Sequence, residues 1–281
     1  MTRERAETFH RLHRGGPPLV LVNAWDAVSA RIIEEAGAPA IATTSAGMAW
    51  ALGYADGQQL PVGELVAACG RICRVVKAPV TVDLERGYGR NADEVRSLVR
   101  TLIGQGAVGI NIEDGVDRES GLLVSPRDIL ERIGVVRALA TELGVRLFIN
   151  ARTDAYFAPK ADPKGRFEEA LARARLFAEA GADGIFVPGM DRLEDIRRFA
   201  GEISLPFNVY AGYPGVPAVE ELAAAGVRRV SLGCGPLQSG LSLLRRIAVE
   251  ALSRGRTEAM TADQLRVGEI NALFETAARP G

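Results

Sequence analysis

The sequence contains very little histidine and lysine, and each shortage excludes a kind of catalytic site. Only two histidines occur, His10 and His13, and both precede the first expected strand. A Ser-His-Asp triad or a histidine-ligated metal in the body of the protein is therefore not expected. The three lysines, Lys77, Lys160 and Lys164, lie beside a strand or in a polar loop. Their positions argue against a buried Schiff-base lysine.

Cysteine is equally scarce, with three residues in the chain. Cys69 and Cys73 lie one helical turn apart, so we interpret them as packing residues. Cys234 follows the last expected strand, where a single cysteine is interpreted as a core residue rather than a nucleophile. The spacing matches neither a disulfide framework nor a zinc site.

An excess of one charge and a long apolar run are also missing. Lys and Arg total 34 against 35 Asp and Glu, which gives a formal net charge of -1 and excludes a strongly basic nucleic-acid-binding surface. No run approaches the roughly 18 apolar residues of a membrane span. The charged start MTRERAETFHRLHR has no apolar signal-peptide stretch behind it. We expect a cytoplasmic protein with neither a nucleic-acid nor a membrane partner.

The chain does contain a regular alternation of short apolar runs and amphipathic helical stretches. Several helical stretches end on glycine just before the next run, as in EAGAPA and AEAGADG. Eight such units predict an α/β fold: a (β/α)8 TIM barrel domain over residues 1–255, followed by a C-terminal helical extension over 256–281. The expected strands are 19–23, 40–44, 80–84, 109–113, 147–151, 184–188, 206–210 and 229–233.

Polar side chains gather where these strands end, which is where barrel enzymes carry their chemistry. All five tyrosines fall on this one face, which a purely structural role does not predict. They are Tyr54, Tyr88, Tyr156, Tyr210 and Tyr213.

Three acids form the sharpest feature of this face. Asp83 and Glu85 share one side of a strand by its two-residue alternation, and Glu113 stands at the matching depth on the next strand. Converging carboxylates repel one another unless a cation lies between them, and oxygen ligands favour Mg²⁺ or Mn²⁺ over zinc. The alternative is structural, with the acids capping helices or pairing with Arg86 or Arg152.

Arg152 ends the fifth expected strand and can bind a carboxylate or phosphonate with two parallel hydrogen bonds. An ion pair with Asp154 or Glu113 is the alternative. The stretch from Thr44 to Gly47 offers successive backbone N–H groups and a hydroxyl to an anion.

With these features, the sequence resembles the isocitrate lyase and phosphoenolpyruvate mutase superfamily. The resemblance covers most of the chain, from LVNAWDAVSARIIEEAGAPAI to RRVSLGCGP. Its most specific segments are LGYADGQQLP (52–61), VDLERGYG (82–89), INIEDG (110–115) and NARTDAY (150–156). It implies a Mg²⁺-dependent barrel that makes or breaks a C–C or P–C bond beside a 2-oxo or enol carboxylate.

The resemblance also implies roles for individual residues. Asp83 would bind the metal directly or through water, with Glu85 and Glu113 in its water-bridged shell. Ser45, Ala46, Gly47 and Arg152 would hold the substrate carboxylate, and Asp56 would be the essential loop carboxylate. Tetramers that exchange a C-terminal helix between subunits are common in the superfamily, so we expect a homo-oligomer, a tetramer or a dimer.

Two segments depart from the superfamily pattern. The loop EDGVDRESGLLVSPRDIL lacks the Cys and Lys that lyases carry there, Cys being their acid. The usual Asp-x-Asp-Thr is replaced by Asp83-Leu84-Glu85-Arg86, which adds a cation beside the expected metal. We therefore look for the general acid among the tyrosines or a metal-bound water.

Together these interpretations predict a Mg²⁺-dependent lyase that cleaves a C–C bond of a small 2-hydroxy or 2-oxo di- or tricarboxylate through a pyruvate-type enolate. Alternatives are P–C bond chemistry, hydrolysis or decarboxylation of an oxaloacetate-like acid, and a barrel that binds a small acid without turnover. The predicted metal ligands are Asp83, Glu85 and Glu113, and the predicted catalytic residues are Asp56, Tyr88, Arg152, Tyr156 and Tyr210. The predicted substrate-binding residues are Trp25, Ser45, Ala46, Gly47, Asp83, Arg152 and Asn208.

Overall fold

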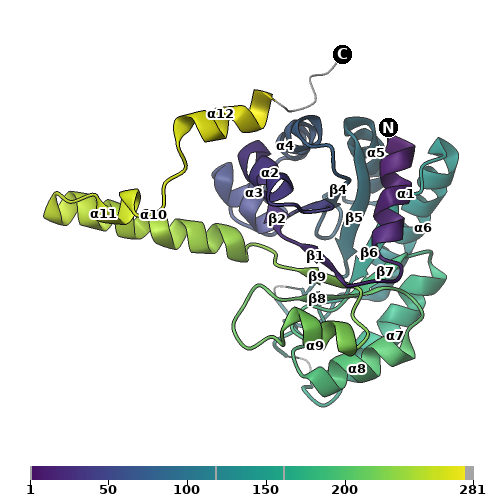
Figure 1. The fold of residues 1–281 in the computed structure, drawn as a ribbon. Coiled ribbons are helices and arrows are strands. Elements are labelled where there is room, and N and C mark those ends of the chain that lie inside the picture. The colour runs from purple at the N-terminus through teal and green to yellow at the C-terminus, as the bar shows by residue number, and fades with distance from the viewer. Residues whose placement is uncertain (1, 118, 161, 276–281) are drawn as a thin grey trace.

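The computed structural model describes residues 2–117, 119–160 and 162–275, and parallel strands form its centre (Figure 1). The strand order in the sheet is β1-β9-β8-β7-β6-β5-β4-β3-β2. The strands are β1 Leu19–Leu21, β2 Asn23–Ala24, β3 Ile41–Thr43, β4 Val80–Asp83, β5 Ala107–Glu113, β6 Phe148–Arg152, β7 Gly184–Phe186, β8 Phe207–Tyr210 and β9 Arg229–Ser231.

The predicted (β/α)8 barrel is confirmed, with one difference in its first strand. The expected strand 19–23 is split at Val22 into β1 and β2. The halves pair with opposite neighbours, β1 with β9 and β2 with β3, so the first strand joins the two ends of the sheet. The remaining expected strands agree with the observed ones to within two residues at either end.

Helices alternate with the strands and surround them (Figure 1). Their ends follow local sequence signals: α5 begins where Asn91 accepts a hydrogen bond from the Glu94 N–H and ends at Gly106 with φ of 106°. The helices are α1 Thr2–Leu12, α2 Ala27–Glu35, α3 Ser45–Ala51, α4 Val62–Val75, α5 Ala92–Gln105, α6 Pro126–Leu143, α7 Arg166–Glu179, α8 Leu193–Glu202, α9 Val219–Ala224, α10 Gly235–Arg254, α11 Glu258–Thr261 and α12 Val267–Glu275.

Helix α1 closes the end of the barrel where the strands begin. The Phe9 ring meets the Phe148 ring edge-on at 5.4 Å, and the His13 ring stacks on Phe148 at 4.0 Å. A Cβ at Gly109 would lie 2.9 Å from the Phe9 ring, so glycine at this position leaves room for α1 to pack against the strands. The opposite end, where the strands finish, stays open for a site.

The helix after the last strand leaves the barrel instead of covering it. Figure 1 shows α10 pointing away, and only Leu237 of its 20 residues is buried. Helix α12 returns to α2, where Arg31 Nε donates to the Leu273 carbonyl at 2.8 Å. Of the predicted extension, residues 276–281 lie outside the described part. In the described ranges no helix is long and apolar enough to cross a membrane.

His13, which follows α1, makes the stability of the barrel depend on pH. Burial lowers the pKa of His13 to about 3 from an ordinary value of 6.5. Below pH 6.5 the unfolded chain binds a proton that the folded protein does not, so stability falls as pH drops towards 3, by about 1.4 kcal/mol per pH unit. In His13→Asn, which keeps a donor for the Phe9 carbonyl, we expect this component to be lost. Urea unfolding at pH 7, 5.5 and 4.5 measures it, and parallel pH profiles of the two proteins would contradict it.

Candidate active site

A pocket of about 210 Å³ lies at the end of the barrel where the strands finish. The residues that line it come from nine separate stretches of the sequence, among them the ends of most of the strands. Of the residues predicted from the sequence, six line this pocket: Ser45, Ala46, Asp56, Asp83, Arg152 and Tyr210. Convergence of distant strand ends on one cavity is the usual arrangement of a barrel active site.

Asp83 ends β4 on the wall of the pocket. Its backbone N–H donates to Thr43 Oγ1 at 2.9 Å, and its Oδ2 accepts from the Ser45 N–H at 3.3 Å. Its other oxygen, Oδ1, is buried and has no hydrogen-bond partner among the described residues. A buried carboxylate oxygen without a partner is unfavourable, so this atom is suited to a cation or a water.

Glu85 lies in a strained, interlocked turn beside Asp83. Glu85, Gln58 and Tyr88 all have left-handed backbones, with φ of 47°, 61° and 55°. The Gln58 N–H and the Tyr88 hydroxyl both donate to Glu85 Oε1, at 3.0 and 2.7 Å. Burial raises the pKa of Glu85 to about 7, and the charges of Asp83 and Asp56 add to the rise. Backbone strain of this kind persists where neighbouring contacts enforce it, which is common at functional sites.

Arg152 is held between two acids at the end of β6. Its Nη1 lies 3.1 Å from Glu113 Oε2, and its Nε lies 2.6 Å from Asp154 Oδ1. Burial raises the pKa of Glu113 well above its usual range, although Arg152 opposes the rise. The ion pairs proposed as the structural alternative for Arg152 are thus present. They leave further guanidinium N–H groups facing the pocket that Arg152 lines.

Asp56 enters the pocket from the loop after α3. Burial raises its pKa, and a hydrogen bond with the Ser45 side chain opposes the rise. Ser45, Ala46 and Gly47 form the first turn of α3, with Thr44 as the N-cap. The stretch expected to be a loop is therefore a helix start, which still directs backbone N–H groups towards the mouth.

Three predicted substrate-binding residues pack behind the pocket. A Cβ at Gly47 would lie 3.1 Å from the Trp25 Cβ, so the two residues are packed against each other. Asn208 is fully buried and accepts a hydrogen bond from Ser231 Oγ at 3.2 Å. The structure therefore places Trp25, Gly47 and Asn208 next to the lining rather than in it.

The predicted catalytic tyrosines are placed differently from one another. The Tyr88 hydroxyl is engaged by Glu85 outside the lining of the pocket, and Tyr156 lines a separate cavity under the Arg166 guanidinium, 5.9 Å from its ring. Only Tyr210 lines the pocket. Burial raises its pKa to about 12, so its hydroxyl keeps its proton at neutral pH.

Tyr210 leads to a residue that the sequence interpretation missed. Cys234, expected to be a core residue, lines the pocket beside Tyr210, whose side chain partly offsets the rise that burial causes in the pKa of the Cys234 thiol. A Cβ at Gly212 or Gly233 would lie 2.5 or 2.7 Å from the Tyr210 ring, so both glycines make room for it. Burial raises the pKa of the Cys234 thiol, which keeps it protonated. In the sequence, Gly212 and Gly233 near the ends of two expected strands were the features that could have indicated this arrangement.

Arg229 is a second missed residue, and it lies inside the barrel. It is fully buried, and its Nη2 donates to Asn111 Oδ1 at 3.1 Å. Burial lowers its pKa to about 9, which the negative charge of Asp83 opposes. An arginine sharing the inward side of a strand with Ser231 was a readable signal, because the two-residue alternation gives them one face.

The donor set around Asp83 fits a hard divalent cation held mainly through water. No three His, Cys, Asp or Glu side chains of the described residues come together as a direct ligand cluster. Asp83 has a free buried oxygen, however, and Glu85 and Glu113 stand behind it with raised pKa values that reflect burial and crowded negative charge. Arg86, expected as an extra cation, packs its side chain against Gly115, and no ion pair joins it to these acids in the described residues.

Known proteins share this sequence and this fold. The profile of the phosphoenolpyruvate phosphomutase family matches residues 9–252. The 2-methylisocitrate lyase of Aeropyrum pernix is 32% identical over 67% of this chain and 59% of its own, and an oxaloacetate decarboxylase of a Bradyrhizobium species is 29% identical over 99% of each. The crystal structure of a candidate phosphonomutase from Burkholderia cenocepacia is 39% identical, with a TM-score of 0.83 over 89% of this chain and 100% of that one.

These matches confirm the resemblance seen in the motifs around Asp83, Glu113 and Arg152. Named relatives act on small carboxylates as lyases or decarboxylases, and the matching family is one of mutases. The chain belongs to the isocitrate lyase and phosphoenolpyruvate mutase superfamily of enzymes.

Proposed function

We propose that this protein is a divalent-metal-dependent lyase that cleaves a C–C bond of a small 2-hydroxy or 2-oxo di- or tricarboxylate. The observation that carries the proposal is one small pocket in which Asp83, Arg152 and the Tyr210–Cys234 pair meet. These groups supply a metal ligand, a carboxylate-binding cation and protonated donors. Each is a requirement of enolate chemistry at neutral pH.

Asp83 would hold the cation, with Glu85 and Glu113 behind it, and Mg²⁺ or Mn²⁺ fits these oxygen donors. When bound, the cation supplies stabilisation for the negative charge that gathers on the substrate's enolate oxygen. Arg152 would bind the substrate carboxylate, and its ion pairs with Glu113 and Asp154 fix the direction of the guanidinium.

The protein's own groups can move the protons of the reaction. Asp56, whose pKa is raised by burial, would accept the proton of a substrate hydroxyl as the C–C bond breaks. In a 2-oxo substrate with a hydroxyl at C4, the hydroxyl-bearing carbon leaves as a carbonyl compound, and the electrons of the broken C3–C4 bond remain on C3 as a pyruvate-type enolate. A proton from Tyr210, or from Cys234 beside it, then converts the enolate into a 2-oxo acid.

P–C bond chemistry is the second candidate, favoured by the 39% identity with the candidate phosphonomutase. Arg152 is the single cationic side chain among the residues that line the pocket. The apolar residues Phe157, Phe186 and Pro188 in the same lining suit a carbon substituent better than a phosphonate dianion. Turnover of a panel of oxo-acids, hydroxy-acids and phosphonopyruvate separates the two, because activity on phosphonopyruvate alone would reverse the order.

We also propose that the protein is a homo-oligomer in which α10 docks on a neighbouring copy. Leu241, Leu244 and Leu252 repeat on one side of α10 and are 44%, 59% and 89% exposed. Apolar surface exposed along a protruding helix is typical of an interface. If α10 packs against a neighbouring copy, the α10 of that neighbour can cover the side of the barrel that the protein's own α10 leaves uncovered.

Of the three predicted metal ligands, Asp83 alone lines the pocket. Asp83→Asn should abolish specific Mg²⁺ binding, because the neutral amide removes its negative charge. Calorimetric titration with Mg²⁺ in the presence of oxalate, a mimic of the pyruvate enolate, measures the loss. Asp93→Asn, at an exposed position on α5, is the matched control and should bind like the unchanged protein. Undiminished binding by Asp83→Asn would remove the metal site from the proposal.

Tyr210→Phe and Cys234→Ala should each lower kcat, by about 100-fold if the changed group is the proton donor. Exchange of the C3 protons of pyruvate in D₂O, followed by proton NMR with Mg²⁺ present, reports on the same step without the C–C cleavage. Tyr156→Phe is the matched comparison, since its hydroxyl lies at another cavity, and it should keep full exchange. If the Tyr210 and Cys234 variants both exchange normally, the donor is elsewhere.

Leu244→Glu with Leu252→Glu should dissociate the oligomer, because burying two carboxylates in an apolar contact costs several kcal/mol. Light scattering coupled to size-exclusion chromatography gives the mass. Leu176→Glu, on the outer side of α7 and 38% exposed, should leave the mass unchanged. A monomeric mass for the unchanged protein would refute the oligomer.

A further inference from the structure

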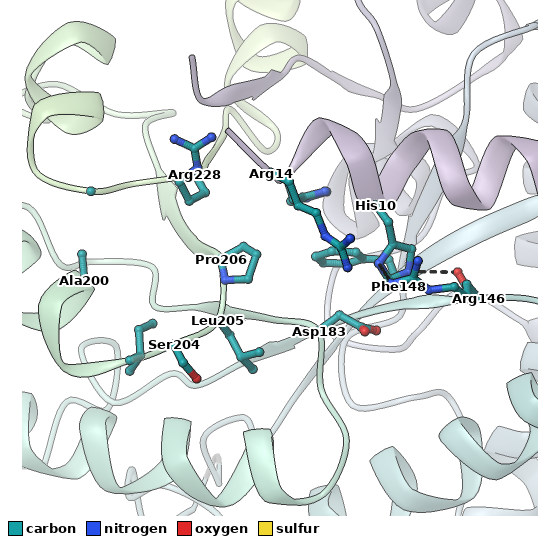
Figure 2. A pocket seen from close by; sticks show the side chains of 13 residues that line it. His10, Arg14, Arg146, Phe148, Asp183, Ala200, Ser204, Leu205, Pro206 and Arg228 are labelled. Atoms are coloured by element: carbon teal, nitrogen blue, oxygen red, sulfur yellow. Dashed lines mark hydrogen bonds between the residues drawn. The ribbon is translucent and has the colours of Figure 1, made fainter. Parts of the chain in front are cut away.

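A second, larger cavity lies at the end of the barrel where the strands begin, away from Asp83. Its volume is about 490 Å³ (Figure 2). Its walls come from α1 and from the residues that precede or open β6, β7, β8 and β9. Phe148 forms an apolar side, and the His10 and His13 rings lie 5.0 and 4.0 Å from its ring.

Positive charge dominates this cavity. Arg14, Arg146 and Arg228 line it, against a single lining acid, Asp183. In the view of Figure 2, Arg14 and Arg228 lie along one side, and Asp183 lies across from them. Asp183 is already engaged, because it forms an ion pair with Arg137 and accepts the Ile149 N–H at 2.9 Å.

Within the described part of the chain, two of the three arginines have no counter-ion. Arg146 pairs with Glu7 at 2.9 Å, but among the described residues no carboxylate forms an ion pair with Arg14 or Arg228. One nitrogen of Arg228, Nη1, donates to the Gly16 carbonyl at 3.0 Å. Its Nη2 is buried and has no partner in the described part of the chain. A buried guanidinium N–H without an acceptor in the chain is suited to a water or to an oxygen of a bound anion.

His13 supplies a second buried nitrogen without a partner. The residue is 3% exposed, and its Nδ1 lies 2.8 Å from the Phe9 carbonyl, so Nδ1 carries the proton. The remaining nitrogen, Nε2, has no partner among the described residues, and since it is unprotonated it would accept a hydrogen bond from a hydroxyl of a bound molecule rather than donate to its anionic oxygens. His10, in contrast, is satisfied on both nitrogens, by the Arg146 carbonyl at 3.0 Å and the Arg146 guanidinium at 3.3 Å.

A purely structural reason for the arginines explains only part of this pattern. Helix α8 ends just before the cavity wall at Ile203, and the carboxyl end of a helix carries partial negative charge that attracts cations. That charge is about half an elementary charge and is screened by solvent. It does not balance two full charges, nor does it give Arg228 Nη2 an acceptor.

We propose that this cavity is a binding site for a small dianion of the phosphate type, separate from the active site. Arg14 and Arg228 would bind the anion, and Ser204 belongs to the same lining. The volume exceeds that of the inorganic ion, so a small phosphorylated metabolite fits the cavity. The site does not depend on which reaction the other end of the barrel performs.

Inorganic phosphate is the probe, titrated into the full chain by calorimetry at constant ionic strength with EDTA present. We expect one site per chain. Arg14→Gln with Arg228→Gln should weaken the Kd at least about tenfold, because charged hydrogen bonds are lost. Arg14→Gln alone, which leaves the Gly16 contact intact, should weaken it less and serves if the double variant unfolds.

Two controls decide where a bound phosphate lies. Arg71→Gln with Arg74→Gln removes the same charge from exposed positions on α4 and should bind like the unchanged protein. Arg152→Gln, in the active-site pocket, should do so too. Phosphate binding that survives loss of Arg14 and Arg228, that weakens equally in the α4 control, or that vanishes with Arg152 would overturn the proposal.

Discussion

Negative charge buried at one end of the barrel is the constraint on which the rest of the site depends. Burial, together with the charge of Asp83, raises the pKa values of Asp56, Glu85 and Glu113, and that of Glu85 reaches about 7. Such crowding in a place with little water is unfavourable unless nearby groups offset it. The strained turn of Glu85, which brings two donors to its carboxylate, is one such compensation.

Arg152 is the second compensation, and it links structure to substrate binding. A guanidinium has five N–H donors in a fixed plane, so ion pairs with Glu113 and Asp154 orient it without using all of them. The same pairs prevent it from swinging out to solvent. A carboxylate that enters the pocket therefore meets a cation whose direction is already set, which reduces the entropy lost on binding.

Much of the fold and part of the site were readable from the sequence, because both depend on local pattern. The alternation of strands and helices predicted the barrel. Because the carboxyl ends of barrel strands meet at one face, it also predicted that Asp83 and Arg152 lie at the same end. Tyr156 was expected there as well, but the turn after β6 directs it to another cavity. Cys234 was interpreted as a core residue because it is a single cysteine after a strand, but it lines the pocket beside Tyr210, whose ring Gly212 and Gly233 accommodate. Contacts between loops of different strands leave no periodic trace in a sequence.

The negative charge of Asp83 also helps to explain why the buried side chain of Arg229 is tolerated inside the barrel. Arg229 is fully buried with only an amide and a hydroxyl as hydrogen-bond partners, which by itself is unfavourable. The negative charge of Asp83 raises its pKa, so the cation and the acids reduce each other's penalty. A divalent cation bound at Asp83 would favour the ionised forms of Glu85 and Glu113, whose pKa values burial raises.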